Sequence, residues 1–150
     1  MTFNGYDNFI EVPGHSNPTE NLTISIWAKS NIENWDAIGC FVSKRNAFIF
    51  GPMDEKMLRM YIHSSEGWTS IEYTLPLETN IECWHHYASV FNGSQLFLYV
   101  DGIQVATRNH DRTISANTRH MTIGWDDYNN GIKRHLDGQI AEVAICIYLS

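Results

Sequence analysis

Apolar and polar residues alternate strictly along residues 22–28, where every second side chain is apolar: Leu22, Ile24, Ile26 and Ala28. A period of two is typical of a β-strand with one buried face. Similar runs rich in β-branched and aromatic residues recur, separated by Gly, Pro, Asn and Asp, and helical periodicity is almost absent. The pattern predicts strands over residues 9–12, 22–28, 38–43, 47–50, 57–63, 68–74, 83–91, 95–100, 103–107, 121–124 and 139–148.

Turn residues between neighbouring runs predict hairpins. Lys44-Arg45-Asn46 and Ser64-Ser65-Glu66-Gly67 each join two strands, and Asp101-Gly102 is a tight turn. The loop Asn92-Gly93-Ser94 allows more than one register. A three-residue loop collects the apolar residues on one face, so we expect Gly93 to be left-handed or bulged. The cross-strand pairs would then be Val90 with Leu96, Ala88 with Leu98 and His86 with Val100.

Many short strands with regular turns indicate an all-β sandwich or barrel. Most neighbouring strands would pair as hairpins. The longer connections, residues 13–21, 29–37 and 108–119, are where the chain could cross between two sheets. No linker, tandem repeat or low-complexity tract interrupts the pattern. A chain of 150 residues suits one domain, so we assign residues 1–150 to a single unit.

Charge and cysteine content narrow the classes of partner. The net charge of −7 argues against a nucleic-acid backbone, which needs clustered Lys and Arg, and suits cation binding or solubility. Three cysteines without metal-ligand spacing favour a reduced compartment. No apolar run follows Met1, and no stretch is long and apolar enough to cross a membrane. We therefore expect a cytoplasmic location, unless the chain is part of a longer exported precursor.

Several motifs occur in a characteristic order along the chain. They are Phe3–Pro13, Leu22–Trp27, Trp84-x-His86-x-Ala88, Leu98-Tyr99-Val100-Asp101-Gly102 and Asp137-Gly138-x-Ile140-x-Glu142-Val143. Together they resemble the laminin-G-like, concanavalin A-like jelly-roll family over nearly the whole chain. The resemblance implies a two-sheet antiparallel jelly-roll sandwich. Lectins, pentraxins, laminin modules and some glycosidases share that fold, so the resemblance leaves the function open.

The best candidate site is the polar loop after residues 121–124, which by position resembles the pentraxin calcium loop. We expect its ligand-binding residues to be Trp125, Asp126, Asp127, Tyr128 and Asn129. Calcium binds carboxylate, amide and carbonyl oxygens, and Asp126 and Asp127 are the expected metal ligands. Trp125 and Tyr128 could stack on the apolar face of a sugar ring. A turn-rich loop without a ligand is the alternative interpretation.

Other aromatic and histidine residues have plainer interpretations. Trp35 and Trp68 lie near loops, and we interpret each as a cap on an open end of the core. His85 and His86 are adjacent on a strand and point to opposite faces, so they cannot form one metal site. We expect His86 to pack beside Ala88 as a structural histidine.

The other histidines fall into two groups, one on the face of His85 and one scattered along the chain. His85 would share the opposite face with Tyr87, Phe97 and Tyr99, either as a ligand groove or as the inside of a covered sheet. The scattered histidines are interpreted as surface residues: His110, His120 and His135.

Catalysis has little support. Retaining glycosidases need two carboxyl groups about 5 Å apart, and the chain has no Glu-x-Asp-x-Glu strand for them. It also lacks a nucleophile elbow, a P-loop and zinc-type Cys/His spacing. We therefore expect a non-catalytic, lectin-like module that binds carbohydrate or a glycoconjugate, with Ca²⁺ as its candidate cofactor. Weak single-site affinity would be offset by self-association.

Two alternatives remain open at this stage. A protein-interaction or assembly module of the laminin-G type would present a broad apolar or charged surface. An enzyme built on the jelly-roll scaffold would have a deep pocket with a perturbed histidine or carboxylate, for which His85 is the candidate.

Overall fold

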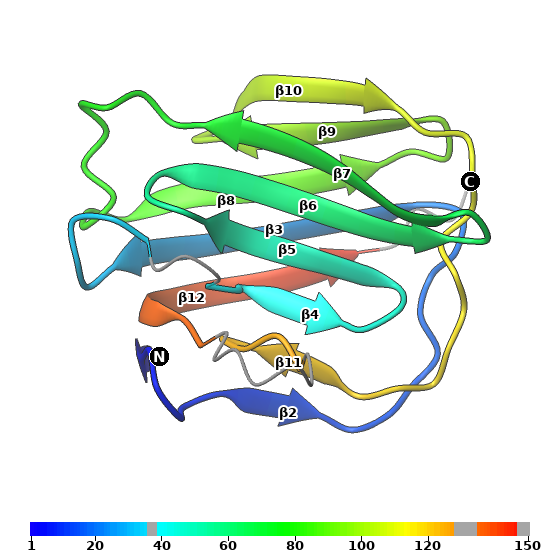
Figure 1. The fold of residues 1–150 in the computed structure, drawn as a ribbon, viewed down its shortest axis with the longest axis horizontal. Helices are drawn as coiled ribbons and strands as arrows, with labels where there is room; N and C mark the ends of the chain where they lie inside the picture. The colour runs from blue at the N-terminus through cyan, green and yellow to red at the C-terminus, as the bar shows by residue number, and fades with distance from the viewer. Residues whose placement is uncertain (36–38, 128–134, 147–150) are drawn as a thin grey trace.

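The computed structural model describes residues 1–35, 39–127 and 135–146, and every regular element in them is a β-strand. Two antiparallel sheets of six strands pack face to face (Figure 1). The strand order of sheet A is β1 (Thr2–Asn4), β12 (Asp137–Cys146), β3 (Leu22–Ser30), β8 (His85–Phe91), β9 (Gln95–Val100) and β10 (Ile103–Asn109). That of sheet B is β2 (Ile10–Val12), β11 (Met121–Ile123), β4 (Val42–Lys44), β5 (Phe48–Met53), β6 (Met57–Ser64) and β7 (Gly67–Thr74).

This architecture is the predicted two-sheet antiparallel jelly roll. The strand predicted over 38–43 begins only at Val42 and ends at Lys44. The strand predicted over 139–148 begins earlier, at Asp137, and is described as far as Cys146. Residues 38 and 147–148 lie outside the described residues. None of the described elements is a helix of the length and apolarity needed to cross a bilayer. None of the three cysteines forms a disulfide within the described residues: Cys40 is buried, and Cys83 and Cys146 are exposed.

The core lies between the sheets and follows from the alternation. On β3 the predicted apolar face is buried, and Ile24, Ile26 and Ala28 have no exposed surface. Sheet B faces them with the alternate residues of β6, chiefly Met60 and Ile62. Each large apolar side chain buried in this way stabilises the fold by about 1.5–3 kcal/mol. The remaining residues of each strand are left on the two outer faces.

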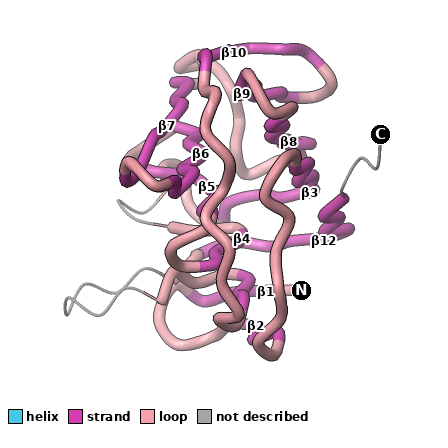
Figure 2. The backbone as a smooth tube through the Cα atoms, turned by 90° about the vertical axis from the view of Figure 1, so that its right-hand side faces the viewer, coloured by secondary structure: helices cyan, strands magenta, loops and turns pink. Residues whose placement is uncertain are grey.

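The three long connections predicted to cross between sheets all do so. Residues 13–21 join β2 to β3. The predicted ranges 29–37 and 108–119 begin inside β3 and β10, and the connections that follow those strands lead to β4 and β11 in the other sheet. Figure 2 shows the long loops running from one sheet to the other. The chain also changes sheet from β1 to β2, from β7 to β8 over residues 75–84, and from β11 to β12, and none of these crossings is predicted from the sequence.

The register predicted for the β8–β9 hairpin is wrong by one residue. The structure pairs Val90 with Phe97 and Ala88 with Tyr99. Gly93 has the expected positive φ, 96°. The Asn92 amide, however, donates to the Gln95 carbonyl at 3.1 Å, and the Asn92 side chain accepts from the amides of Ser94 and Gln95. These bonds close a tighter turn than apolar pairing alone suggests.

A slip of one residue changes which side chains face the core. Tyr87 is buried between the sheets, whereas His86 lies on the outer face of sheet A, with its ring 5.3 Å from that of Trp27. The interpretation of His86 as a residue packed in the core is therefore wrong. The predicted aromatic face is divided as well, because Phe97 and Tyr99 lie on the outer side and Tyr87 on the inner side.

His110 also differs from its prediction as a surface residue. It is only 7% exposed and packs against Phe91 at 5.5 Å. Burial lowers the pKa of His110, since the charged imidazolium loses its hydration there. Trp35 behaves as predicted: it is 4% exposed and caps the core edge-on against Phe41.

The hydroxyl group of Tyr87 is buried and has no hydrogen-bond partner within the described residues. Burial, followed by the nearby charge of Asp101, raises the pKa of Tyr87 far above its ordinary value of 10.0. Between the ordinary pKa of 10.0 and the raised pKa of the folded state, the unfolded chain releases the tyrosine proton and the folded chain keeps it. The unfolded state then binds fewer protons, so stability falls as the pH rises.

Tyr87→Phe removes both the buried hydroxyl that lacks a partner and the proton that titrates there. At about pH 8 we expect unchanged stability or a gain of up to about 1 kcal/mol, because an unsatisfied buried hydroxyl is lost. Above about pH 10 the wild type should lose stability relative to the variant by a slope approaching 1.4 kcal/mol per pH unit. Guanidinium unfolding followed by tryptophan fluorescence measures the difference. A difference that stays constant with pH would contradict this account.

Candidate functional site

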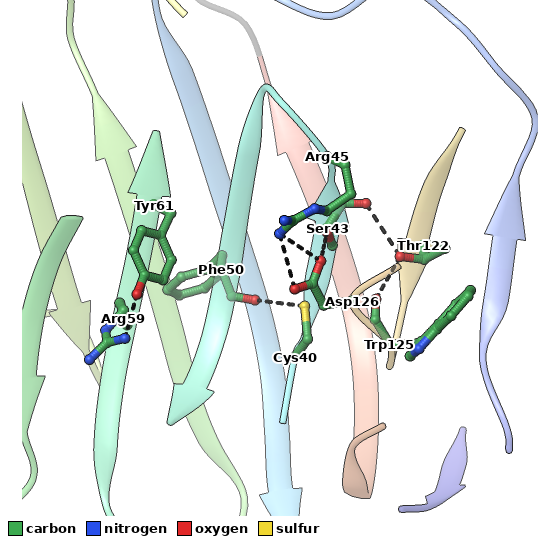
Figure 3. Close-up of polar contacts among 9 residues, drawn as sticks. All are labelled: Cys40, Ser43, Arg45, Phe50, Arg59, Tyr61, Thr122, Trp125 and Asp126. Atoms are coloured by element: carbon green, nitrogen blue, oxygen red, sulfur yellow. Dashed lines mark hydrogen bonds and ion pairs between the residues drawn. The ribbon is translucent and has the colours of Figure 1, made fainter. Parts of the chain in front are cut away.

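The predicted loop sends its side chains in different directions. Trp125 and Asp126 point to opposite sides of the segment that follows β11 (Figure 3). Asp127 contacts His120, with 2.9 Å between Asp127 Oδ2 and His120 Nε2. Tyr128 and Asn129 lie outside the described residues. The first three predicted residues therefore do not converge on one point.

Asp126 is the buried member of the loop, with 2% of its surface exposed. The Ser43 hydroxyl donates to its Oδ1 at 2.7 Å. The Arg45 Nη1 donates to Oδ2 at 3.2 Å and to Oδ1 at 3.4 Å. Ser43 belongs to β4, and Arg45 to the turn between β4 and β5. The carboxylate thus gains a hydrogen bond and a counter-charge in exchange for its lost hydration.

Trp125 already contacts other rings. The His135 ring stacks on it at 5.4 Å with an interplanar angle of 10°, and Phe9 lies 4.5 Å from it. The hydroxyl group of Thr122 donates to its carbonyl oxygen at 2.6 Å. These contacts compete with the sugar stacking predicted for Trp125.

The residues described around this loop do not by themselves fit calcium. A calcium ion takes about six to eight oxygen ligands. Asp126 is paired with the Arg45 guanidinium and Asp127 with His120. Within the described residues no group of three or more His, Cys, Asp or Glu side chains is placed to hold a metal.

A cavity of about 120 Å³ opens on the outer face of sheet B beside Asp126. At roughly 30 Å³ per water this is space for about four water molecules, so it is a notch rather than a deep pocket. Figure 3 shows Arg59 and Tyr61 on β6 at one side and Cys40 and Asp126 at the other. The lining residues are Gly39, Cys40, Ile49, Gly51, Pro52, Met53, Arg59, Tyr61 and Asp126.

Gly51 in β5 allows one wall of this cavity to form. A Cβ atom at this position would lie 2.6 Å from the Phe41 nitrogen and 2.8 Å from the Cys40 Cα. Those are backbone atoms, and the Phe41 amide is already bonded to the Phe50 carbonyl at 3.0 Å. Any side chain at residue 51 would therefore push the wall away from the sheet.

Arg59 and Tyr61 form the opposite wall. The Arg59 guanidinium donates to the Tyr61 hydroxyl at 2.5 Å and to Glu72 at 3.0 Å, and lies 5.1 Å from the Tyr61 ring centre. These contacts fix both side chains on the outer face. The Arg59 Nε is buried and has no hydrogen-bond partner in the described part of the chain.

Trp68 lies on the outer face of sheet B, next to the wall formed by Arg59 and Tyr61. The prediction that Trp68 caps the core is therefore wrong. It is 38% exposed, and its ring lies 4.9 Å from His63 and 6.0 Å from Tyr61. The Arg45 guanidinium lies 5.4 Å from the same ring. Arg45 therefore connects the buried carboxylate of Asp126 to Trp68. We call Arg45, Tyr61, His63 and Trp68 the aromatic–arginine surface.

One sequence signal could have revealed part of this site. Along β6 the buried residues alternate with Arg59, Tyr61 and His63, so three polar or aromatic side chains share the outer face. Their placement opposite Asp126, which lies 81 positions from Arg45 in the sequence, depends on the tertiary fold.

Comparisons with known proteins identify the family of this chain and structures that share its fold. A family model described as the concanavalin A-like lectin/glucanases superfamily matches residues 4–148. Domains LG4-5 of the mouse laminin alpha1 chain superpose with a TM-score of 0.73 at 16% identity, over 96% of this chain and 40% of that one. This chain thus spans less than half of the laminin fragment. A search of curated proteins found no match.

Two further structures share the fold. The CBM40 module of the Ruminococcus gnavus IT-sialidase, bound to alpha2,3 sialyllactose, has a TM-score of 0.66 at 16% identity, covering 93% of this chain and 89% of that one. The heptameric SAP-like pentraxin of Limulus polyphemus has a TM-score of 0.65 at 19% identity, covering 96% and 73%. With the family model matching almost the whole sequence, the chain belongs to the concanavalin A-like lectin/glucanase superfamily.

Proposed function

We propose that this chain is a carbohydrate-binding module whose glycan lies on the outer face of sheet B. The observation that carries the proposal is the notch beside Asp126 in direct continuation with the aromatic–arginine surface. Sugars are bound by aromatic faces that cover their C–H groups and by polar side chains that bond their hydroxyls. Both kinds of group are present here.

The charges of the site favour a neutral, hydroxyl-rich ligand. Arg45 is paired with Asp126, and Arg59 with Glu72, so the four charges balance. Such pairs present donors and acceptors in fixed directions without a net field.

The similar structures support a carbohydrate ligand in general, and not its charge. The Ruminococcus gnavus module was solved with alpha2,3 sialyllactose, and it shares the fold over 93% of this chain. Of the residues predicted from sequence, Asp126 lines the proposed site. Trp125 and Asp127 contact other partners, and Tyr128 and Asn129 stay predicted ligand residues.

Trp68→Ala and Trp27→Ala form a matched pair, because both tryptophans are 38% exposed and they lie on different sheets. Loss of a stacking ring at the proposed site should weaken glycan binding by about tenfold, corresponding to about 1.4 kcal/mol. Trp27→Ala should bind as the wild type does. A glycan array followed by calorimetry on the strongest ligand measures both. Equal losses, or a loss confined to Trp27→Ala, would reject this site.

Calcium is tested separately. Because Arg45 pairs with Asp126 and the His120 ring nitrogen lies 2.9 Å from Asp127 Oδ2, we expect chelator-stripped protein to keep its glycan binding. Calorimetric titration of calcium into that protein, with and without glycan, gives the answer. A calcium signal that disappears in Asp126→Asn/Asp127→Asn and restores glycan binding would instead support the predicted calcium loop.

A protein-interaction module is the second candidate, and one feature favours it. Trp27 and Trp84 are exposed on sheet A or at its margin, and the Lys29 ammonium lies 5.4 Å from the Trp84 ring. Exposed tryptophans are enriched at protein interfaces. Binding of a protein ligand that is lost in Trp27→Ala and kept in Trp68→Ala would support this function.

A further inference from the structure

A second cavity opens between the sheets at the edge formed by β7 and β10, which run close together in Figure 1. Its volume is about 540 Å³, within the range of roughly 300–1,000 Å³ typical of small-molecule sites. It shares no lining residue with the notch on sheet B. We call it the edge cleft. Its lining residues are Tyr73, Leu75, Pro76, Thr79, Asn80, Cys83, His85, Val100, Asp101, Ile103 and Val105.

The walls of the edge cleft are largely apolar. Leu75 is buried at its base, and Val100 and Val105 are half-buried on β9 and β10. Ile103 is 67% exposed at the mouth, so it offers apolar surface that the fold itself does not cover. An apolar ligand body would remove this surface from water at roughly 25 cal/mol per Å².

Polar groups gather around Asp101, in the turn between β9 and β10. Asp101 and Gly102 have φ values of 50° and 79°, as a tight hairpin turn requires. The turn directs the Asp101 carboxylate back to β8, where Oδ1 accepts from the His86 amide at 2.9 Å. Its Oδ2 lies 2.7 Å from the His85 Nδ1. The side chain remains 46% exposed, so the carboxylate is accessible to a ligand.

Asp101 stays ionised at neutral pH. Partial burial acts to raise its pKa, but the hydrogen bonds from the His85 side chain and the His86 amide, with the charges of both histidines, lower the pKa below its ordinary value. His85 offers no free ring N–H, since its second nitrogen, Nε2, is bonded to the Asn80 carbonyl at 2.9 Å. Asp101, whose side chain stays 46% exposed beside its His85 partner, is therefore the carboxylate that the cleft offers to a ligand.

We propose that the edge cleft binds a small molecule with an apolar body and a protonated amine, with the amine on Asp101. The apolar walls would cover the body, and the carboxylate would form a charge-assisted hydrogen bond with the amine. The net charge of −7 favours the approach of a cation over that of an anion. The same charge complementarity disfavours a carboxylate ligand at this position.

Three probes with a common phenyl body test the proposal: phenethylamine, phenethyl alcohol and hydrocinnamate. Titrations followed by amide chemical shifts should show phenethylamine perturbing residues 100–105 and binding about tenfold more tightly than phenethyl alcohol. Hydrocinnamate should bind most weakly. Asp101→Asn keeps an acceptor for the His86 amide and suits the left-handed turn, and it should abolish the preference for the amine.

A pair of variants on β10 separates the cleft from the rest of the surface. Val105→Trp would fill the cleft and should abolish binding of all three probes. Gln104→Trp adds the same side chain beside Tyr99, on the outer face, and should leave binding unchanged. Unfolding curves confirm that each variant is folded. Absence of binding, equal affinity for amine and alcohol, a preference for hydrocinnamate, or unchanged binding by folded Val105→Trp would overturn the proposal.

Discussion

The carboxylate of Asp126 is almost wholly removed from water, and the outer face of sheet B is organised around its neutralisation. An unpaired buried carboxylate costs several kcal/mol, so the fold must supply a counter-charge. Arg45 supplies it at 3.2 Å and Ser43 adds a hydrogen bond at 2.7 Å. Removing one partner of such a pair typically costs about 3–5 kcal/mol. The pair therefore joins the segment after β11 to the hairpin of β4 and β5.

The same pair determines where the aromatic surface lies. With its guanidinium held at Asp126, the Arg45 side chain also lies 5.4 Å from the Trp68 ring. Trp68 in turn contacts His63 and Tyr61 on the neighbouring strand. Gly51 admits the Cys40–Phe41 backbone to the other side of the notch. A satisfied buried charge, a close backbone approach and a row of rings thus combine into one preorganised surface. Preorganisation of this kind lowers the entropic cost of ligand binding.

Alternation along the sequence determines much of this fold. The period of two that places Leu22, Ile24 and Ile26 in the core is visible in the sequence, and so are the long connections between sheets. The predicted β8–β9 register was wrong because the Asn92 side chain accepts hydrogen bonds that close the turn. Matching apolar residues across the strands does not take such local bonds into account. The wrong placement of His86 in the core followed from that error in the predicted register.

The candidate site was only partly predictable for a different reason. Asp126 stood out as a loop carboxylate, but its counter-ion comes from a turn far away in the chain. Trp35 and Trp68 look alike in sequence, yet one caps the core and the other lies on an outer face, because strand pairing and not residue type decides burial. Arg59 and Tyr61 required knowledge of which face of β6 is covered and which is open.

The most direct test of the central claim is to locate a bound glycan on the protein. Amide chemical shifts recorded during titration with the best ligand from a glycan array would map its position. If the glycan lies on the outer face of sheet B, the shifts gather on β4, β5, β6 and the start of β7, around Gly51, Tyr61 and Trp68. Shifts confined to the outer face of sheet A, around Trp27 and His86, would contradict that position.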